Sequence, residues 1–220
     1  MHALALQKWC EATLPQCAHW HGERIESFPS GSRQEAREKR QQEFSAGRHC
    51  ARLCLETLQI SQEVPVAEDR SPIWPSGIVG SISHSDLSVW AVVARATQLR
   101  SVGIDTESID RAGKIDVQST IASDEEWKLV DRLGFDAATS LSLVFSAKES
   151  FYKCWYPLTN CYFDFLDAIV VDANDDSISI SHGPSNPNQG MRPETLDVRY
   201  QVRAGEVFTA TWIGHPGGSV

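Results

Sequence analysis

The stretch Val102-Gly103-Ile104-Asp105-Thr106-Glu107 decides how the rest of the chain is interpreted. Alternate residues of a strand point to the same face of a sheet, so Asp105 and Glu107 lie side by side. Val102 and Ile104 then point into the core. Two carboxylates this close repel each other unless a cation lies between them, and oxygen-only ligands suit Mg²⁺, which also binds substrate phosphates. For this pair alone, a polar strand end that faces water is the alternative.

Glu149 and Lys153 form a second candidate group, four residues apart on a helix predicted from Asp136 to Trp155. A glutamate placed four residues before a lysine stabilises a helix by about 0.2–0.5 kcal/mol, so a surface ion pair is the simple interpretation. The functional interpretation makes Glu149 a third metal ligand or a general base, and Lys153 a neutraliser of phosphate charge. The aromatic residues of this helix favour a packed helix: Phe145, Phe151, Tyr152 and Trp155.

Basic side chains earlier in the chain are candidates for phosphate binding. His84 follows Ser83 where a predicted strand ends, so its ring can donate to a phosphate, although a lone histidine is more often structural. Arg48 and Arg52 lie four apart on one helix face, where like charges repel unless an anion binds them. Glu56 is one such anion for Arg52, and a phosphate held bidentately is the other.

The amino-terminal half predicts one long helix, a loop and three strands. Ser32 and Glu35 form a capping box that opens a helix ending near Leu58. Its buried stripe is expected from residues at helical spacing: Phe44, Gly47, Ala51, Cys54, Leu55 and Leu58. A loop rich in proline and charge follows over 63–77. The strands are predicted at 79–83, 88–95 and 101–107, with a polar turn at 84–86 joining the first two.

The carboxy-terminal half loosely repeats this combination of helices and strands. Ser123 and Glu126 form a second capping box, which opens a helix that stops at Gly134. The helix from Asp136 to Trp155 follows, with Leu141, Val144, Phe145 and Tyr152 on its apolar side. Strands are expected at 168–172, 177–181, 196–203 and 207–213, with an exposed loop over 182–193. Both halves combine helices with antiparallel strands, which indicates the α+β class.

Composition limits the function classes. A net charge of −9 argues against a general nucleic-acid binder and against adhesion to anionic membranes. No apolar run is long enough for a signal peptide or a membrane span. The six cysteines form no CxxC pair, so we expect reduced thiols and a cytoplasmic location: Cys10, Cys17, Cys50, Cys54, Cys154 and Cys161. Four possible zinc ligands match no standard spacing: His19, His21, His49 and Cys50.

The order of these motifs resembles the 4′-phosphopantetheinyl transferases of the Sfp type, and among them the branch of the enterobactin-synthase transferase component. The family signature is a Gly-(Val/Ile)-Asp strand followed by a helix reading (Trp/Phe)-Ser-x-Lys-Glu-(Ser/Ala)-x-x-Lys. Here the strand is Val102–Glu107, and the helix is Phe145-Ser146-Ala147-Lys148-Glu149-Ser150-Phe151-Tyr152-Lys153. The branch's Trp-Pro-x-Gly-x-x-Gly-Ser lead-in appears as Trp74-Pro75-Ser76-Gly77-Ile78-Val79-Gly80-Ser81. The Ser-His motif is present as Ser83-His84, and the helix motif Gly47-Arg48-x-x-Ala51-Arg52 matches too. The resemblance covers Ser45 to Pro157, and the residues after it carry no usable motif.

The resemblance implies a fold of two similar α+β halves related by a pseudo-twofold, in a monomer. The halves are expected at 1–104 and 105–220, with coenzyme A bound in the cleft between them. It further implies that the metal ligands are Asp105, Glu107 and Glu149. The residues implied to bind coenzyme A are Arg48, Arg52, Arg70, Ser83, His84 and Lys153, with Arg52 the least certain because Glu56 can hold it.

The implied reaction moves 4′-phosphopantetheine from coenzyme A to a serine of an apo carrier protein and releases 3′,5′-ADP. The catalytic residues are then Glu149, Lys153 and His84. Glu149 is the candidate base, acting directly or through a metal-bound water, and the sequence does not decide which carboxylate removes the proton. Mg²⁺ is the implied cofactor, with Mn²⁺ as the alternative. The partners are coenzyme A and an acyl, aryl or peptidyl carrier, and the sequence does not choose the carrier.

Two rival functions remain open at the level of sequence. A different metal-dependent phosphoryl or phosphodiester enzyme could use the same three carboxylates and basic residues, and it would need no protein acceptor. A non-catalytic module that only binds carrier proteins could keep the fold. The intact Asp105, Glu149 and Lys153 argue against that second rival.

Overall fold

The computed structural model describes residues 2–25, 33–109, 117–182 and 195–216. The chain divides into two compact units: unit 1 contains Met1–Val102 and Gly214–Val220, and unit 2 contains Gly103–Ile213. The division falls inside strand β4 (Leu99–Ser108), whereas the sequence placed it after residue 104. Helices and two sheets are both present, which confirms the α+β class. Among the described residues, no helix combines the length and the hydropathy that crossing a bilayer requires.

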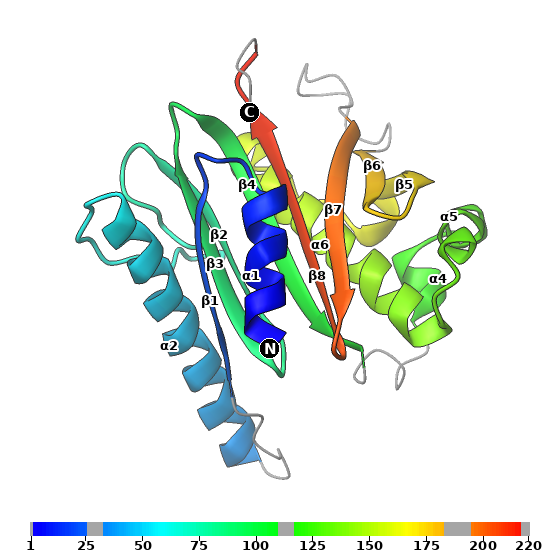
Figure 1. The fold of residues 1–220 in the computed structure, drawn as a ribbon, viewed down its shortest axis with the longest axis horizontal. Coiled ribbons are helices and arrows are strands. Elements are labelled where there is room, and N and C mark those ends of the chain that lie inside the picture. The colour runs from blue at the N-terminus through cyan, green and yellow to red at the C-terminus, as the bar shows by residue number, and fades with distance from the viewer. Residues whose placement is uncertain (1, 26–32, 110–116, 183–194, 217–220) are drawn as a thin grey trace. The chain divides into compact units, whose positions relative to one another are not determined.

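Unit 1 is built on a three-stranded antiparallel sheet with the order β1-β3-β2. Its elements are α1 (His2–Thr13), β1 (His19–Arg24), α2 (Arg33–Thr57), β2 (Ile78–His84) and β3 (Ser88–Arg95). The strands β2 and β3 and the helix α2 confirm the sequence prediction within a few residues, whereas α1 and β1 were not predicted. Figure 1 shows α2 running along the sheet, and it packs on all three strands.

The buried stripe of α2 differs from the prediction at Phe44. Gly47, Ala51, Cys54, Leu55 and Leu58 are buried as expected. Phe44 is 45% exposed, so its placement in the stripe was wrong. Glu43 takes that place at 8% exposure, because it lies four residues before Gly47, on the same helix face. The predicted cap at Ser32 lies outside the described residues.

Unit 2 contains a five-stranded sheet with the order β4-β8-β7-β6-β5. Its strands after β4 are β5 (Ala168–Ala173), β6 (Ser177–His182), β7 (Thr195–Arg203) and β8 (Glu206–Gly214). Its helical segments are α4 (Gln118–Ile121), α5 (Asp124–Val130), η1 (Asp131–Leu133), α6 (Ala137–Thr159) and η2 (Phe165–Asp167). All four predicted strands are confirmed within two residues. Most of the predicted loop at 182–193 lies outside the described residues.

The helix ends of unit 2 follow from local chemistry. Ser123 and Glu126 form the predicted capping box at the start of α5, and Gly134 ends the helical run with a φ of 72°. Asp136 caps α6 by accepting from the backbone N–H of Thr139. The helix α6 continues past the predicted end at Trp155.

Helix α6 forms the centre of the unit 2 core. It packs on β6 and β7, and Figure 1 shows it behind the sheet. The largest fully buried apolar side chains of this core come from α6 and β6: Leu143, Phe151, Ile178 and Ile180. A helix anchored in this way holds the side chains of its motif in fixed positions.

Candidate functional site

Strand β4 and helix α6 approach closely at Gly103. A Cβ atom at this position would overlap the carbonyl oxygen of Ser150 and lie 2.6 Å from the backbone nitrogen of Cys154. Only glycine therefore fits where the strand backbone meets the helix. Gly103 and Asp105 share one face of the strand, so the helix that Gly103 admits also covers Asp105, which is 3% exposed.

Asp105 and Lys153 form an ion pair at the centre of the candidate site. Lys153 Nζ donates to Asp105 Oδ1 at 2.5 Å, and the lysine side chain is 28% exposed. Burial acts to lower the pKa of Lys153, but attraction to Asp105, Glu149 and Glu107 outweighs it and raises the pKa. Three carboxylates therefore act on one ammonium group.

Glu149 lies one helical turn before Lys153 and is only partly exposed. Burial raises the pKa of the Glu149 carboxyl, and repulsion from Asp105 raises it further, while attraction to Lys153 opposes both. The ammonium of Lys153 makes its short contact with Asp105, which lies on another element. A simple surface pair between Glu149 and Lys153 therefore does not describe this arrangement.

The carboxylates expected to bind metal are Asp105, Glu107 and Glu149, and they do not form a ready metal cluster. Within the described part of the chain, no three histidine, cysteine, aspartate or glutamate side chains gather at metal-binding distance. Their donor chemistry nevertheless fits Mg²⁺, because all are carboxylates and all attract the same cation, the ammonium of Lys153.

Arg48 and Arg52 lie on α2 in unit 1 and differ in their surroundings. Burial lowers the pKa of Arg48, and its guanidinium carbon lies 4.9 Å from the centre of the Phe44 ring. The Nε–H of Arg48 is buried and donates to no acceptor among the described residues. Arg52 is half exposed and donates to Glu56 at 2.9 Å, as the sequence allowed.

Ser83 and His84 stand at the end of β2, and Arg70 is exposed on the loop before it. Ser83 is buried, whereas the His84 side chain is 46% exposed. The Nδ1 atom of His84 lies 3.7 Å from Oε2 of Glu43, a buried carboxylate that sequence reasoning missed. The position of Glu43 four residues before Gly47 was the signal that could have found it.

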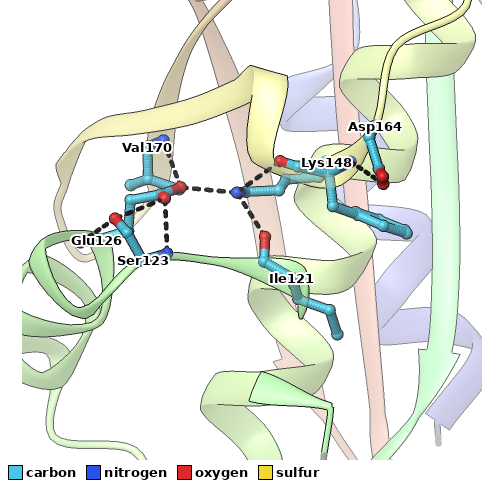
Figure 2. Close-up of polar contacts among 7 residues, drawn as sticks. Ile121, Ser123, Glu126, Lys148, Asp164 and Val170 are labelled. Atoms are coloured by element: carbon cyan, nitrogen blue, oxygen red, sulfur yellow. Dashed lines mark hydrogen bonds and ion pairs between the residues drawn. The ribbon is translucent and has the colours of Figure 1, made fainter. Parts of the chain in front are cut away.

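Lys148 and Glu126 form a buried ion pair that sequence reasoning also missed. Lys148 is 1% exposed, and its Nζ lies 2.6 Å from Glu126 Oε1 (Figure 2). Burial acts to raise the pKa of Glu126, but hydrogen bonds from Lys148, Ser123 and Val170 outweigh it and hold the pKa below its usual range. Lys148 belongs to the Lys-Glu motif of α6, yet its ammonium is directed into the protein rather than to solvent.

Two hollows open on unit 2 beside these groups. The larger, of about 660 Å³, is mainly apolar and reaches Glu107. Its apolar wall includes Ile121, Leu141, Phe145 and Phe165. The smaller, of about 230 Å³, is lined by Glu149, Tyr152 and Tyr162, among others. Two candidate residues, Glu107 and Glu149, therefore each line a hollow that could admit part of a ligand.

Comparison with known proteins identifies the family. The model of the 4′-phosphopantetheinyl transferase N-terminal domain matches residues 29–94, and the model of the 4′-phosphopantetheinyl transferase superfamily matches residues 101–204. The chain is 37% identical over 190 residues to the 4′-phosphopantetheinyl transferase Npt of Nocardia iowensis, a match that covers 79% of this chain and 82% of that relative.

Two further relatives agree with this assignment. The chain is 34% identical over 183 residues to the 4′-phosphopantetheinyl transferase PptT of Mycobacterium tuberculosis, covering 78% of each chain. It is 33% identical over 150 residues to enterobactin synthase component D of Escherichia coli K12, covering 67% of this chain and 69% of the relative. These matches include both units, and the chain belongs to the 4′-phosphopantetheinyl transferase superfamily.

Proposed function

We propose that this chain transfers the 4′-phosphopantetheine group of coenzyme A to a serine of an apo acyl, aryl or peptidyl carrier protein and releases 3′,5′-ADP. Membership of the family supports the reaction. The observation that carries it to this chain is the contact of Asp105 with Lys153, one helical turn after Glu149, at an ammonium that Glu149 and Glu107 also attract. Such a group can hold phosphate charge and accept a proton in one place.

We assign Asp105, Glu107 and Glu149 as the oxygen ligands of Mg²⁺. Their attraction to a single cation is the property that a divalent ion would use. When bound, the ion would neutralise charge on the phosphate being transferred. Mn²⁺ accepts the same oxygen ligands and remains the alternative.

The transfer requires one bond to form and one to break. The serine oxygen forms a bond to the phosphorus that carries the pantetheine arm. The bond from that phosphorus to 3′,5′-ADP breaks, and its electron pair leaves with 3′,5′-ADP. The serine proton passes to Glu149, whose raised pKa makes it a better acceptor at neutral pH. Lys153 and His84 donate to the phosphate oxygens as charge develops on them. Positioning and neutralisation supply most of the acceleration in such a transfer.

Unit 1 supplies the groups that we assign to the nucleotide part of coenzyme A. Arg48 is the strongest candidate, because its buried Nε has no acceptor among the described residues and a phosphate would provide one. Arg70, Ser83 and His84 are assigned to the remaining phosphate contacts. Arg52 is the least suited of these candidates, because Glu56 already binds its guanidinium.

We further propose that the chain works as a monomer in the cytoplasm, with two halves related by a pseudo-twofold. Each unit combines a long helix with an antiparallel sheet, which supports the relation between the halves. The six cysteines are free thiols, which suits a reducing compartment.

One incubation tests the proposed function. The purified chain is mixed with coenzyme A and an apo carrier protein, with either Mg²⁺ or a chelator, and the intact mass of the carrier is measured. We expect the carrier to gain one phosphopantetheine group only when Mg²⁺ is present, with one 3′,5′-ADP released per transfer. Cleavage of coenzyme A without a carrier would indicate a different phosphoryl enzyme, and carrier binding without any product would indicate a non-catalytic module.

A further inference from the structure

All three N–H groups of the Lys148 ammonium donate to acceptors inside the protein. Its Nζ donates to Glu126 Oε1 at 2.6 Å, to the carbonyl oxygen of Ile121 at 2.7 Å and to the carbonyl oxygen of Phe165 at 3.0 Å. A lysine ammonium has three N–H donors, so these three acceptors use all of them. Lys148 is therefore not available to bind a phosphate, although it directly precedes Glu149 in the motif.

Glu126 is satisfied on both carboxylate oxygens. Its Oε1 accepts from Lys148 and from the backbone N–H of Val170 at 2.9 Å. Its Oε2 accepts from the backbone N–H and the hydroxyl of Ser123, both at 2.9 Å. Figure 2 shows Ile121, Ser123 and Val170 converging on Lys148 and Glu126. These contacts join α4, the cap of α5 and β5 to the pair, which itself lies on α6 and α5.

The pair holds one segment of unit 2 at two points. The carbonyl of Phe165 is bound to Lys148 and the N–H of Val170 is bound to Glu126, so the segment 164–170 is attached to α6 and α5. Asp164 and Phe165 line both hollows, and Ala168 lines the smaller one. The segment that the pair holds is therefore the wall shared by the two hollows.

A buried ion pair is weak evidence for stability, because apolar residues of similar volume often stabilise a protein equally well. A fully satisfied polar network instead fixes one arrangement of the segments that it joins. In this network the joined segments are the shared wall and the helix that bears Glu149 and Lys153. Both of the segments that the network joins therefore border the candidate site.

We propose that Lys148 and Glu126 are positioning residues, which set the segment 164–170 against α6 so that the two hollows keep the shape that a substrate requires. This inference rests on the proposed function and names residues outside the reacting groups. Neither residue contacts the phosphate in this proposal. Lys148 lines the smaller hollow, but its ammonium is taken up by Glu126 and two backbone carbonyls, so both residues act through the segment 164–170. Loss of the pair should therefore weaken substrate binding more than it slows the chemical step.

The test is the double variant Lys148→Met with Glu126→Gln, which removes both charges and keeps the approximate volumes. Arg199→Met with Asp176→Asn is the matched control, because it removes an exposed ion pair, of length 2.6 Å, from the same unit. Hydrogen exchange is measured on the segment 164–170, and KM and kcat are measured for coenzyme A and an apo carrier. If the double variant does not fold, Lys148→Gln with Glu126→Gln takes its place with the same readings, because it also removes both charges and leaves two neutral side chains that can hydrogen-bond to each other.

We expect exchange in the segment to become about tenfold faster, and the KM of at least one substrate to rise about tenfold with kcat within about threefold of the parent. The control should change neither. Parental exchange, or faster exchange with parental KM values, overturns the proposal, as does a collapse of kcat at unchanged KM. If the parent shows no transfer, the proposed function fails, and unchanged exchange in the variant would still reject the positioning role separately.

Discussion

At the scale of single residues, Glu149 and Lys153 lie one helical turn apart and respond to burial in opposite ways. The pKa of Glu149 is raised mainly by burial, whereas carboxylates overcome burial at Lys153 and raise its pKa as well. Both groups thus hold a proton more strongly in the folded chain than in the unfolded chain. For Glu149 this means that folding stability falls as pH rises from the ordinary pKa of a glutamate to the raised one.

Glu149→Gln should separate catalysis from stability. Loss of a general base costs roughly 10²–10⁴ in rate, and loss of a metal ligand would add to that. Stability at neutral pH should be equal or higher, because the variant no longer buries this carboxylate, and its contribution to the pH slope should vanish. Turnover and melting between acidic and neutral pH are the measurements.

Glu125→Gln is the matched control for this change, because the Glu125 side chain is 81% exposed in the same unit. It should leave both turnover and melting near the parental values. Parental turnover in Glu149→Gln would return the residue to a surface role and remove it from the mechanism.

Arg48→Ala should weaken coenzyme A binding by about ten- to a hundredfold, because a hydrogen bond to a charged group contributes roughly 1.5–3 kcal/mol. Arg52→Ala, one turn further along α2, is the control and should cost less than about threefold because Glu56 binds that guanidinium. Calorimetric titration with coenzyme A measures both variants. Equal binding by Arg48→Ala and the parent would contradict the assignment.

At the scale of elements, the contact of β4 with α6 at Gly103 controls the site. The sequence motif places glycine two residues before Asp105, and the structure gives the reason, since the helix backbone lies where a side chain would be. The strand can carry its carboxylates close to the helix only because this position has no Cβ.

Gly103→Ala should lower stability by about 1–3 kcal/mol, as overpacking does, and should reduce turnover sharply by moving Asp105 away from Lys153. The control is Gly134→Ala, because a Cβ at Gly134 meets nothing within 4 Å. An alanine there would be strained only by the backbone φ of 72°. Chemical denaturation and turnover should show loss of activity in the first variant and retained activity in the second. Full activity in Gly103→Ala would mean that the close contact is not needed.

Sequence reasoning worked at this scale where the pattern is local. The strand predicted at 101–107, the helix α6 and the cap at Ser123 all follow from residue periodicity or from two residues three apart, and the structure extends the strand to 99–108. Strand β1 was missed because its residues His19-Trp20-His21-Gly22-Glu23-Arg24 show no alternation, and pairing with β3 is what makes them a strand. Phe44 was misplaced because apolar character alone did not reveal that Glu43 points inward.

At the scale of the whole molecule, the network around Lys148 joins parts of unit 2 that are distant in sequence. Its partners lie 17 to 27 residues away from it, so no local pattern encodes them. For the candidate site, the motif gave Asp105, Glu149 and Lys153, whereas the Asp105–Lys153 contact depends on how β4 packs on α6. Residue types were thus predictable from sequence, and their pairing was not.

Lys148→Met alone should destabilise the folded state by about 3–5 kcal/mol, because it leaves the Glu126 carboxylate buried without its counter-ion. Arg199→Met is the control and should cost no more than about 1 kcal/mol, because its ion pair with Asp176 is exposed. Denaturant unfolding followed by circular dichroism measures both. Similar losses in the two variants would mean that burial of the Lys148 pair has no energetic consequence.

The two lysines of the motif should also differ as targets for an amine-acylating reagent. Lys153 is partly exposed, but its raised pKa keeps it protonated and therefore slow to react at neutral pH. Burial lowers the pKa of Lys148, which favours the reactive free amine, yet its nitrogen is enclosed. Acylation of Lys148 can then proceed only during moments when the surrounding segments separate. The labelling rate of Lys148 would therefore report how often these segments of unit 2 open. Peptide mass spectrometry can measure it without any substrate present.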